Sequence, residues 1–207
     1  EVIMKLIFGT TNKRKVEDLQ NIINEMNLDI EVVSMKDIGW DRGDIDENGS
    51  TIEDNSLIKA QAILSFCEVH GINYPIMTDD AGLYVDELNG EPGIYTARYA
   101  DDELLVDSSL PKYQCVIKLL RKMDGIKNRN AKYRCCVTIM LSDGEYYQEI
   151  GESEGVIANE IIGELSKPYF YSVFILNGTD VSFNELSDIE LNNTYRYKAL
   201  RKALKRF

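Results

Sequence analysis

Two adjacent acidic residues, Asp79 and Asp80, follow a short apolar run, Pro75–Met77, and precede Gly82. Such a run predicts a buried strand. Neighbouring carboxylates repel each other and are costly to bury. Because a glycine follows, we expect the strand to end at this pair and the chain to turn sharply there. The competing interpretation is an acidic turn in solvent with no chemical role.

A divalent cation is the usual means of holding two carboxylates together. Mg²⁺ prefers oxygen ligands and often completes its shell with substrate phosphates. The pair therefore points toward phosphate chemistry.

Strand-like and helix-like segments alternate through the first half of the chain, and a hairpin follows. Strands are expected at Met4–Phe8, Ile30–Val33, Ala131–Leu141, Glu145–Gly151 and Tyr171–Leu176. Helices are expected after the cap Asn12, after a capping box of Ser50 and Glu53, over Pro111–Met123 and over Asn193–Phe207. This order predicts an α/β fold with a mixed sheet. No composition break divides the 207 residues, so we expect one domain over residues 1–207.

The charge and the apolar runs limit the partners. The chain has 23 basic and 35 acidic residues, a net charge of −12. So acidic a protein repels nucleic-acid backbones, and we expect no nucleic-acid partner. Its apolar runs are shorter than the roughly 20 residues of a spanning helix, so we expect no membrane segment.

Histidine and cysteine usage narrows the chemistry. His70 is the only histidine, which excludes Ser-His-Asp and Cys-His catalysis in their usual forms. The four cysteines show no C-x-x-C spacing, and with no leader they are expected to be reduced thiols of a cytoplasmic protein. Proton transfer therefore falls to carboxylates, lysine, tyrosine or water.

Two further segments carry polar residues at suggestive spacings. Gly9–Lys15 is a strand-to-helix junction with three consecutive cations, and such a helix start favours a bound anion. Without an anion it is a solvated basic turn. In the segment after Glu47, Asn55 and Lys59 lie four residues apart on one helical face, a pattern that is also ordinary helix surface.

The three segments together resemble the inosine/xanthosine triphosphate pyrophosphatase family. Gly9–Lys15 is similar to its motif A-T-x-N-x-x-K, with glycine for alanine. Glu47–Ala60 is similar to E-x-G-x-T-F-x-E-N-A-x-x-K-A, with Ile52 for Phe and Ser56 for Ala. Thr78–Tyr99 is similar to A-D-D-S-G-L-x-V-x-x-L-x-G-x-P-G-x-Y-S-A-R-Y.

The resemblance implies an elongated, two-lobed α/β fold with a central mixed sheet, a cleft between the lobes and a homodimer. It implies hydrolysis of a non-canonical nucleoside triphosphate to monophosphate and pyrophosphate with Mg²⁺. By that likeness Asp80 is the general base, and Glu47, Asp79 and Asp80 hold the metal. The residues that bind substrate would be Thr10, Thr11, Asn12, Lys15, Lys59 and Arg196.

The second half departs from the family pattern where the base is recognised. Ser166–Val173 stands where the family has G-G-F-G-Y-D-P, with Tyr171 near the expected aspartate. The S-H-R motif becomes Thr194-Tyr195-Arg196, so tyrosine replaces the histidine. We therefore expect an altered base preference. Tyr169, Phe170 and Tyr171 either stack on a base or belong to the core.

Two other functions fit the same residues. One is a phosphohydrolase that uses the metal site on another phosphorylated substrate. The other is a nucleotide-binding protein with negligible turnover, although binding alone needs no general base.

Overall fold

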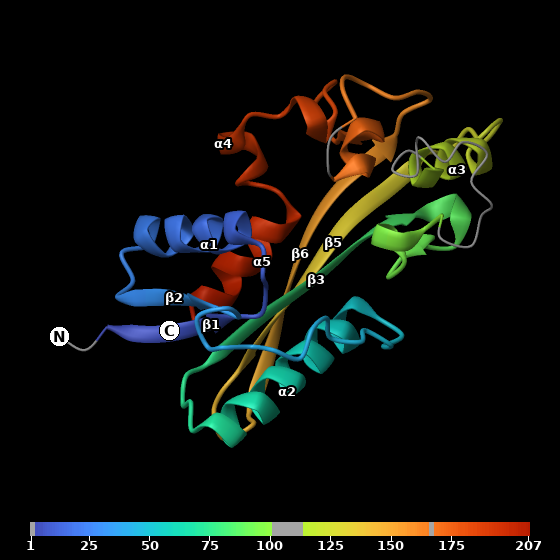
Figure 1. The fold of residues 1–207 in the computed structure, drawn as a ribbon. Coiled ribbons are helices and arrows are strands. Elements are labelled where there is room, and N and C mark those ends of the chain that lie inside the picture. The colour runs from blue at the N-terminus through green and yellow to red at the C-terminus, as the bar shows by residue number, and fades with distance from the viewer. Residues whose placement is uncertain (1–2, 101–113, 166–167) are drawn as a thin grey trace. The chain divides into compact units, whose positions relative to one another are not determined.

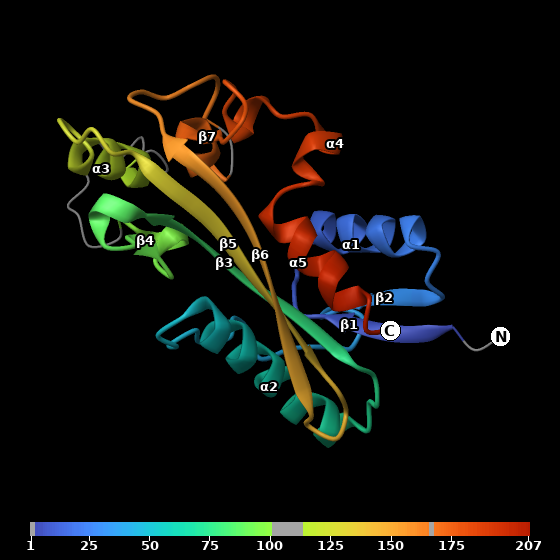
Figure 2. The same ribbon diagram turned by 180° about the vertical axis from the view of Figure 1, so that it is seen from behind.

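A computed structural model describes residues 3–100, 114–165 and 168–207. Within these residues seven strands form one mixed sheet in the order β2-β1-β3-β5-β6-β7, with β4 paired to β3 (Figures 1 and 2). The strands are β1 (Met4–Phe8), β2 (Ile30–Ser34), β3 (Ile76–Val85), β4 (Pro92–Gly93), β5 (Asn130–Met140), β6 (Tyr146–Ile157) and β7 (Phe174–Leu176). The helices are α1 (Lys13–Glu25), α2 (Ile52–His70), α3 (Gln114–Lys122), α4 (Asp188–Leu191) and α5 (Tyr195–Leu204). The predicted α/β class is confirmed, and the start of the predicted helix Pro111–Met123 lies outside the described residues.

The chain divides into two compact units, and the divisions fall inside β3, β5, β6 and α5. The first unit contains Glu1–Asp80, Cys135–Ile150 and Lys198–Phe207, and the second contains Ala81–Arg134 and Gly151–Tyr197. The elongated shape, the cleft and the single domain stay predictions.

The first unit is built on three adjacent parallel strands. β1 pairs in parallel with β2 on one side and with β3 on the other. Its residues Leu6, Ile7 and Phe8 are fully buried, as expected of a parallel strand covered on both faces. Figures 1 and 2 show α1 over one side of β1 and β2, and α2 over the other.

The two helix starts follow the expected capping chemistry, with one shift in position. Asn12 caps α1, because its Oδ1 accepts a hydrogen bond from the Arg14 N–H at 3.0 Å. The predicted capping box of Ser50 and Glu53 is wrong by one residue. Thr51 is the cap of α2, and its hydroxyl accepts from the Asp54 N–H at 3.0 Å.

The strand that carries the acid pair does not end there, which corrects the predicted sharp turn. β3 runs on through Val85, because its second half pairs with β4, where Leu83 faces Gly93. Gly82 serves this pairing, since a Cβ on it would lie 2.5 Å from the Gly93 carbonyl oxygen. The glycine that suggested a turn instead permits a close strand contact.

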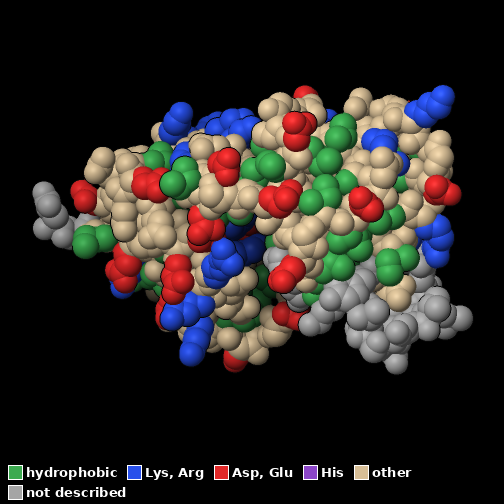
Figure 3. Space-filling model, turned by 90° about the horizontal axis from the view of Figure 1, so that it is seen from above, with side chains coloured by type: hydrophobic (Ala, Val, Ile, Leu, Met, Phe, Trp, Pro, Cys, Tyr) green, Lys and Arg blue, Asp and Glu red, His purple; other side chains and the backbone are tan. Residues whose placement is uncertain are grey.

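The expected absence of nucleic-acid and membrane partners stays a prediction. On the face drawn in Figure 3, lysine and arginine side chains are scattered among acidic ones and do not merge into one basic surface. Among the described residues no helix is long and apolar enough to cross a membrane.

A buried hydroxyl cluster joins α2, β3 and β5, and its member Thr78 directly precedes the acid pair. The Ser56 hydroxyl lies 2.7 Å from that of Thr138 and 3.2 Å from that of Thr78, and all three residues are fully buried. Thr78 also donates to the Ser56 carbonyl at 2.6 Å. Such satisfied networks fix the relative position of the elements that they join.

Thr78 also explains why residue 9, at the start of the predicted phosphate-binding junction, is a glycine. A Cβ built on Gly9 would lie 2.7 Å from Cγ2 of Thr78 and 2.8 Å from Cδ1 of Ile63. These separations are far below ordinary carbon contacts. The threonine methyl group therefore occupies the space that an alanine at position 9 would need.

In the second unit, Glu91 ties the loop after β4 to α3. Its Oε2 accepts from Lys122 Nζ at 2.5 Å and from the Tyr99 hydroxyl at 2.8 Å. The bond from Lys122, followed by that from Tyr99, holds the pKa of the Glu91 carboxyl below its usual value of 4.5. Lys118 of α3 donates to the Tyr99 carbonyl at 2.7 Å, which gives Tyr99 a direct contact with this helix.

Gly9→Ala should destabilise the protein by about 1–3 kcal/mol, because the new methyl group overpacks the site. Thr78→Ser removes the methyl group of Thr78, one of the two groups that obstruct position 9, and keeps the buried hydroxyl. In that background the cost of Gly9→Ala should fall by about 1 kcal/mol. Urea unfolding of the four proteins measures this coupling. Strictly additive costs would contradict the proposed contact between positions 9 and 78.

Glu91→Gln should destabilise the protein near neutral pH and progressively less in acid. Because the folded-state pKa of Glu91 is lowered, its stabilising effect is present above the unfolded pKa. That effect is lost as the pH falls through the folded pKa, below 4.5. Unfolding curves of both proteins between pH 7 and 3 give the difference, and a difference that grows toward acid would refute the assignment.

Candidate active site

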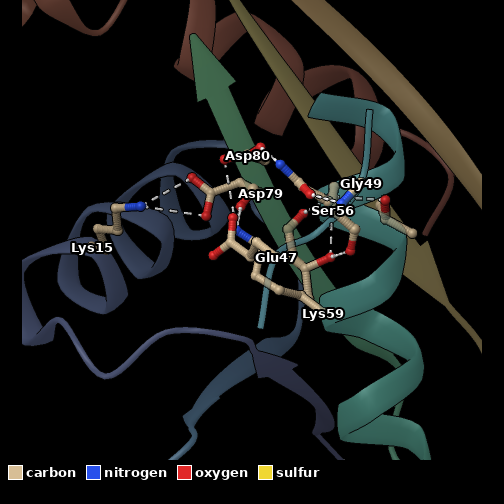
Figure 4. A network of polar contacts seen from close by, with 10 residues as sticks. Lys15, Glu47, Gly49, Ser56, Lys59, Asp79 and Asp80 are labelled. Carbon is tan, nitrogen blue, oxygen red and sulfur yellow. Dashed lines mark hydrogen bonds and ion pairs between the residues drawn. The ribbon is translucent and has the colours of Figure 1, made fainter. Parts of the chain in front are cut away.

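The two adjacent acids of β3 point to opposite sides of the strand. This follows from the two-residue period of side chains along a strand. Asp79 is held by Lys15 of α1, whereas Asp80 is held by residues of α2 (Figure 4). The alternation separates two carboxylates that would otherwise repel each other.

Asp79 is the more deeply buried of the pair and has a cation close to both of its oxygens. Lys15 Nζ lies 3.5 Å from Oδ1 and 3.4 Å from Oδ2. Only 5% of the Asp79 side chain is exposed, against 40% of the Lys15 side chain. A buried carboxylate needs such a partner, because removal from water penalises its charged form.

Lys59 of α2 lies where three oxygen atoms converge. Its Nζ donates to the Asp79 carbonyl at 2.5 Å, and it lies 3.4 Å from Oε1 of Glu47 and 3.9 Å from Oδ1 of Asp80. Only 13% of the Lys59 side chain is exposed. One ammonium group thus links the loop before α2 to both acids of β3, as Figure 4 shows.

Asn55 is a site residue that the sequence analysis did not assign. It is 1% exposed, its Nδ2 donates to Oδ2 of Asp80 at 3.1 Å, and its Oδ1 accepts from the Gly49 N–H at 2.9 Å. Gly49 cannot carry a side chain, because a Cβ would lie 2.5 Å from Cβ of Asp54. Asn55 therefore fixes Asp80 and the loop that carries Glu47 in one arrangement. The available signal was its spacing of four residues from Lys59.

The predicted phosphate-binding junction lies at the start of α1. Asn12 is its cap, and the Thr10 hydroxyl accepts from the Asn12 N–H at 3.1 Å. Thr11 and Asn12 are exposed, and the first turn of α1 contains no acidic residue. The structure thus places Lys15 at the acid pair, while phosphate binding by Thr10, Thr11 and Asn12 stays a prediction.

Arg196 and the divergent aromatic residues belong to the second unit. Tyr195 is 5% exposed, stacks on Tyr133 with ring centroids 4.7 Å apart, and shares a 2.8 Å hydroxyl contact with Tyr171. Phe170 is buried as well, so core packing accounts for it, and Ser166 lies outside the described residues. Substrate binding by the half-buried Arg196 stays a prediction.

The atoms around Lys59 Nζ suit a hard divalent cation. All three are oxygens: one carboxylate oxygen each from Glu47 and Asp80, and the Asp79 carbonyl. Mg²⁺ is typically bound by one or two carboxylates, with water and substrate phosphates completing its shell. In the described part of the chain no group of three or more Asp, Glu, His or Cys side chains has the spacing of a metal site. The Asp79 carboxylate faces Lys15 instead, and its expected role as a ligand stays a prediction.

Comparison with known proteins agrees with the three motifs. The model of the Ham1 family matches residues 6–206. A dITP/XTP pyrophosphatase of Flavobacterium johnsoniae is 33% identical over 203 residues, covering 97% of this chain and 96% of that protein. One of Bacillus subtilis is 32% identical over 206 residues, covering 99% and 98%. Among solved structures, the Staphylococcus aureus Ham1 protein superposes with a TM-score of 0.80 at 27% identity, covering 98% of this chain and 97% of that one. The family resemblance seen in the sequence is confirmed.

Replacing Asn55 tests its role as a positioning residue. Asn55→Ala removes both hydrogen bonds and should cost about 1–3 kcal/mol of stability, because buried partners are left unsatisfied. Asn55→Asp keeps an acceptor for the Gly49 N–H but sets a second carboxylate against Asp80. If the arrangement supports a reaction, each variant should lower kcat about 10–100-fold.

The measurements are urea unfolding and the kcat and KM of pyrophosphate release. A merely structural role would leave kcat of the folded Asn55→Asp protein unchanged. That result, with both variants folded, would remove Asn55 from the site.

Proposed function

Because this chain belongs to the Ham1 family, we propose that it is a nucleoside triphosphate pyrophosphatase dependent on Mg²⁺. It hydrolyses a non-canonical purine nucleoside triphosphate to the monophosphate and pyrophosphate. The names of the curated relatives, dITP/XTP pyrophosphatases, support this substrate class. The observation that carries the proposal is the convergence of Glu47, Asp80 and the Asp79 carbonyl on Lys59, with Lys15 at the Asp79 carboxylate.

The roles of the residues follow from their positions. Asp80 accepts a proton from the attacking water and orients it, because Asn55 and Lys59 hold its carboxylate in place. Lys15 and Lys59 supply positive charge for the triphosphate. Glu47 and Asp80 would hold Mg²⁺, which supplies charge neutralisation at the phosphoryl oxygens and a more acidic water.

We further propose that the protein is one domain with two lobes, forms a homodimer, is cytoplasmic and has a changed base preference. The altered preference rests on Tyr171, near the expected aspartate, and on Tyr195, which stands where the family has histidine. Their mutual hydroxyl contact and the packing of Tyr195 against Tyr133 supply the support. Such a pair presents hydroxyl groups in place of a charged acceptor and an imidazole.

Asp80→Asn should lower kcat by about 10²–10⁴-fold while the protein stays folded, because the amide cannot accept the proton. The assay is pyrophosphate release from a panel of common and deaminated nucleoside triphosphates, with and without Mg²⁺. The exposed Asp86→Asn is the matched control and should keep wild-type turnover.

Near-normal turnover by Asp80→Asn would contradict its role. Release of phosphate only from other phosphate esters would favour the phosphohydrolase alternative. Tight nucleotide binding without product from any triphosphate would favour a binding protein.

A further inference from the structure

We propose that the ammonium group of Lys59 stands in for the divalent cation in the metal-free protein, and that it leaves its three oxygen partners when the cation binds there. The inference rests on the proposed function for the identity of the site. It adds a step that links metal loading to the movement of one side chain.

The first support is the set of atoms around Nζ. The Asp79 carbonyl at 2.5 Å, Oε1 of Glu47 at 3.4 Å and Oδ1 of Asp80 at 3.9 Å approach it from a strand and from a separate loop. These are oxygen donors of the kind that Mg²⁺ selects. Lys59 thus satisfies, with one positive charge, a group of oxygens that would suit a doubly charged ion.

The second support is that the two cations cannot share these atoms. Mg²⁺ binds oxygens at about 2.1 Å, whereas an ammonium group approaches them at roughly 2.8 Å. An ammonium left in contact with the same oxygens would face a divalent charge at a distance where repulsion is strong. Loading of the cation therefore requires Lys59 to move.

The third support is that Lys59 is able to move. Its charge sits at the end of a flexible four-carbon stem, and 13% of the side chain reaches solvent. Asn55, by contrast, is 1% exposed and holds Asp80 by a hydrogen bond that does not involve Lys59. The oxygens therefore keep their arrangement when the lysine departs.

A consequence is that metal and triphosphate load together. Without an anion to receive it, the displaced ammonium group loses three oxygen partners, and this loss weakens metal binding. A triphosphate offers new partners, so by linkage each ligand strengthens the binding of the other. If Lys59 served the phosphates alone, its removal would leave the affinity for metal alone unchanged.

The test is the binding of Mn²⁺ alone, without nucleotide, measured from the free-ion electron paramagnetic resonance signal. Lys59→Met removes the competing charge and should bind Mn²⁺ about tenfold or more tightly than wild type. Lys59→Gln does the same while keeping a donor for the Asp79 carbonyl, in case the methionine variant is unstable. Lys59→Arg keeps a cation in place and should bind Mn²⁺ about as weakly as wild type.

Lys15→Met is the matched control for the general effect of removing one positive charge. Lys15 contacts Asp79 on the other side of β3, and its described contacts include neither Glu47 nor Asp80. Its removal should tighten Mn²⁺ binding by about threefold at most. Circular dichroism and thermal unfolding confirm that each variant is folded.

Equal Mn²⁺ affinities in wild type, Lys59→Gln and Lys15→Met would overturn the inference, as would failure of all of them to bind Mn²⁺ at millimolar concentration. The proposed function is judged separately by pyrophosphate release from wild type. Tighter Mn²⁺ binding by the Lys59 variants, with no triphosphate hydrolysis by wild type, would support the exchange of Lys59 for the metal and refute the pyrophosphatase function. Triphosphate hydrolysis by wild type, with equal Mn²⁺ affinities in wild type and variants, would support the pyrophosphatase function and refute the exchange.

Discussion

The arrangement of charges around β3 depends on two lysines that balance closely placed acids. Lys15 neutralises the buried Asp79, and Lys59 gathers Glu47, Asp80 and the Asp79 carbonyl around one ammonium group. Without these cations, three acids near one strand would repel each other and resist burial. The lysines that stabilise these buried acids would also bind a polyphosphate, and two of the acids would bind its metal. The same residues therefore serve both stability and the proposed chemistry.

The secondary-structure elements that carry these residues could in large part be predicted from the sequence. The apolar run before Asp79 and the cap at Asn12 are local signals, and each located the start of its element correctly. The turn expected at the acid pair was wrong, because the glycine that follows the pair, Gly82, is needed for a contact with another strand. The carbonyl of Gly93 approaches it across a strand pair, a contact that no local pattern reveals.

Residues whose role is set by neighbours far along the chain were the ones that sequence reasoning missed. Asn55 resembles ordinary helix surface until Gly49 and Asp80 are seen at either end of its amide. Likewise, the sequence showed Tyr171 and Tyr195 only as departures from the family pattern. In the structure their hydroxyl groups contact each other within the second unit. The sequence motifs resemble the family in the first half of the chain, whereas the arrangement of the divergent second half could be described only from the structure.

The central claim is that Glu47 and Asp80 hold one divalent cation at the place where Lys59 Nζ now lies. A crystal structure with Mn²⁺ and a non-hydrolysable triphosphate tests it most directly, since the ion is located by its anomalous scattering. The account predicts the ion in direct contact with oxygens of Glu47 and Asp80, with Lys59 Nζ moved onto the phosphates. An ion bound elsewhere, with Lys59 still seated against the Asp79 carbonyl, would contradict it.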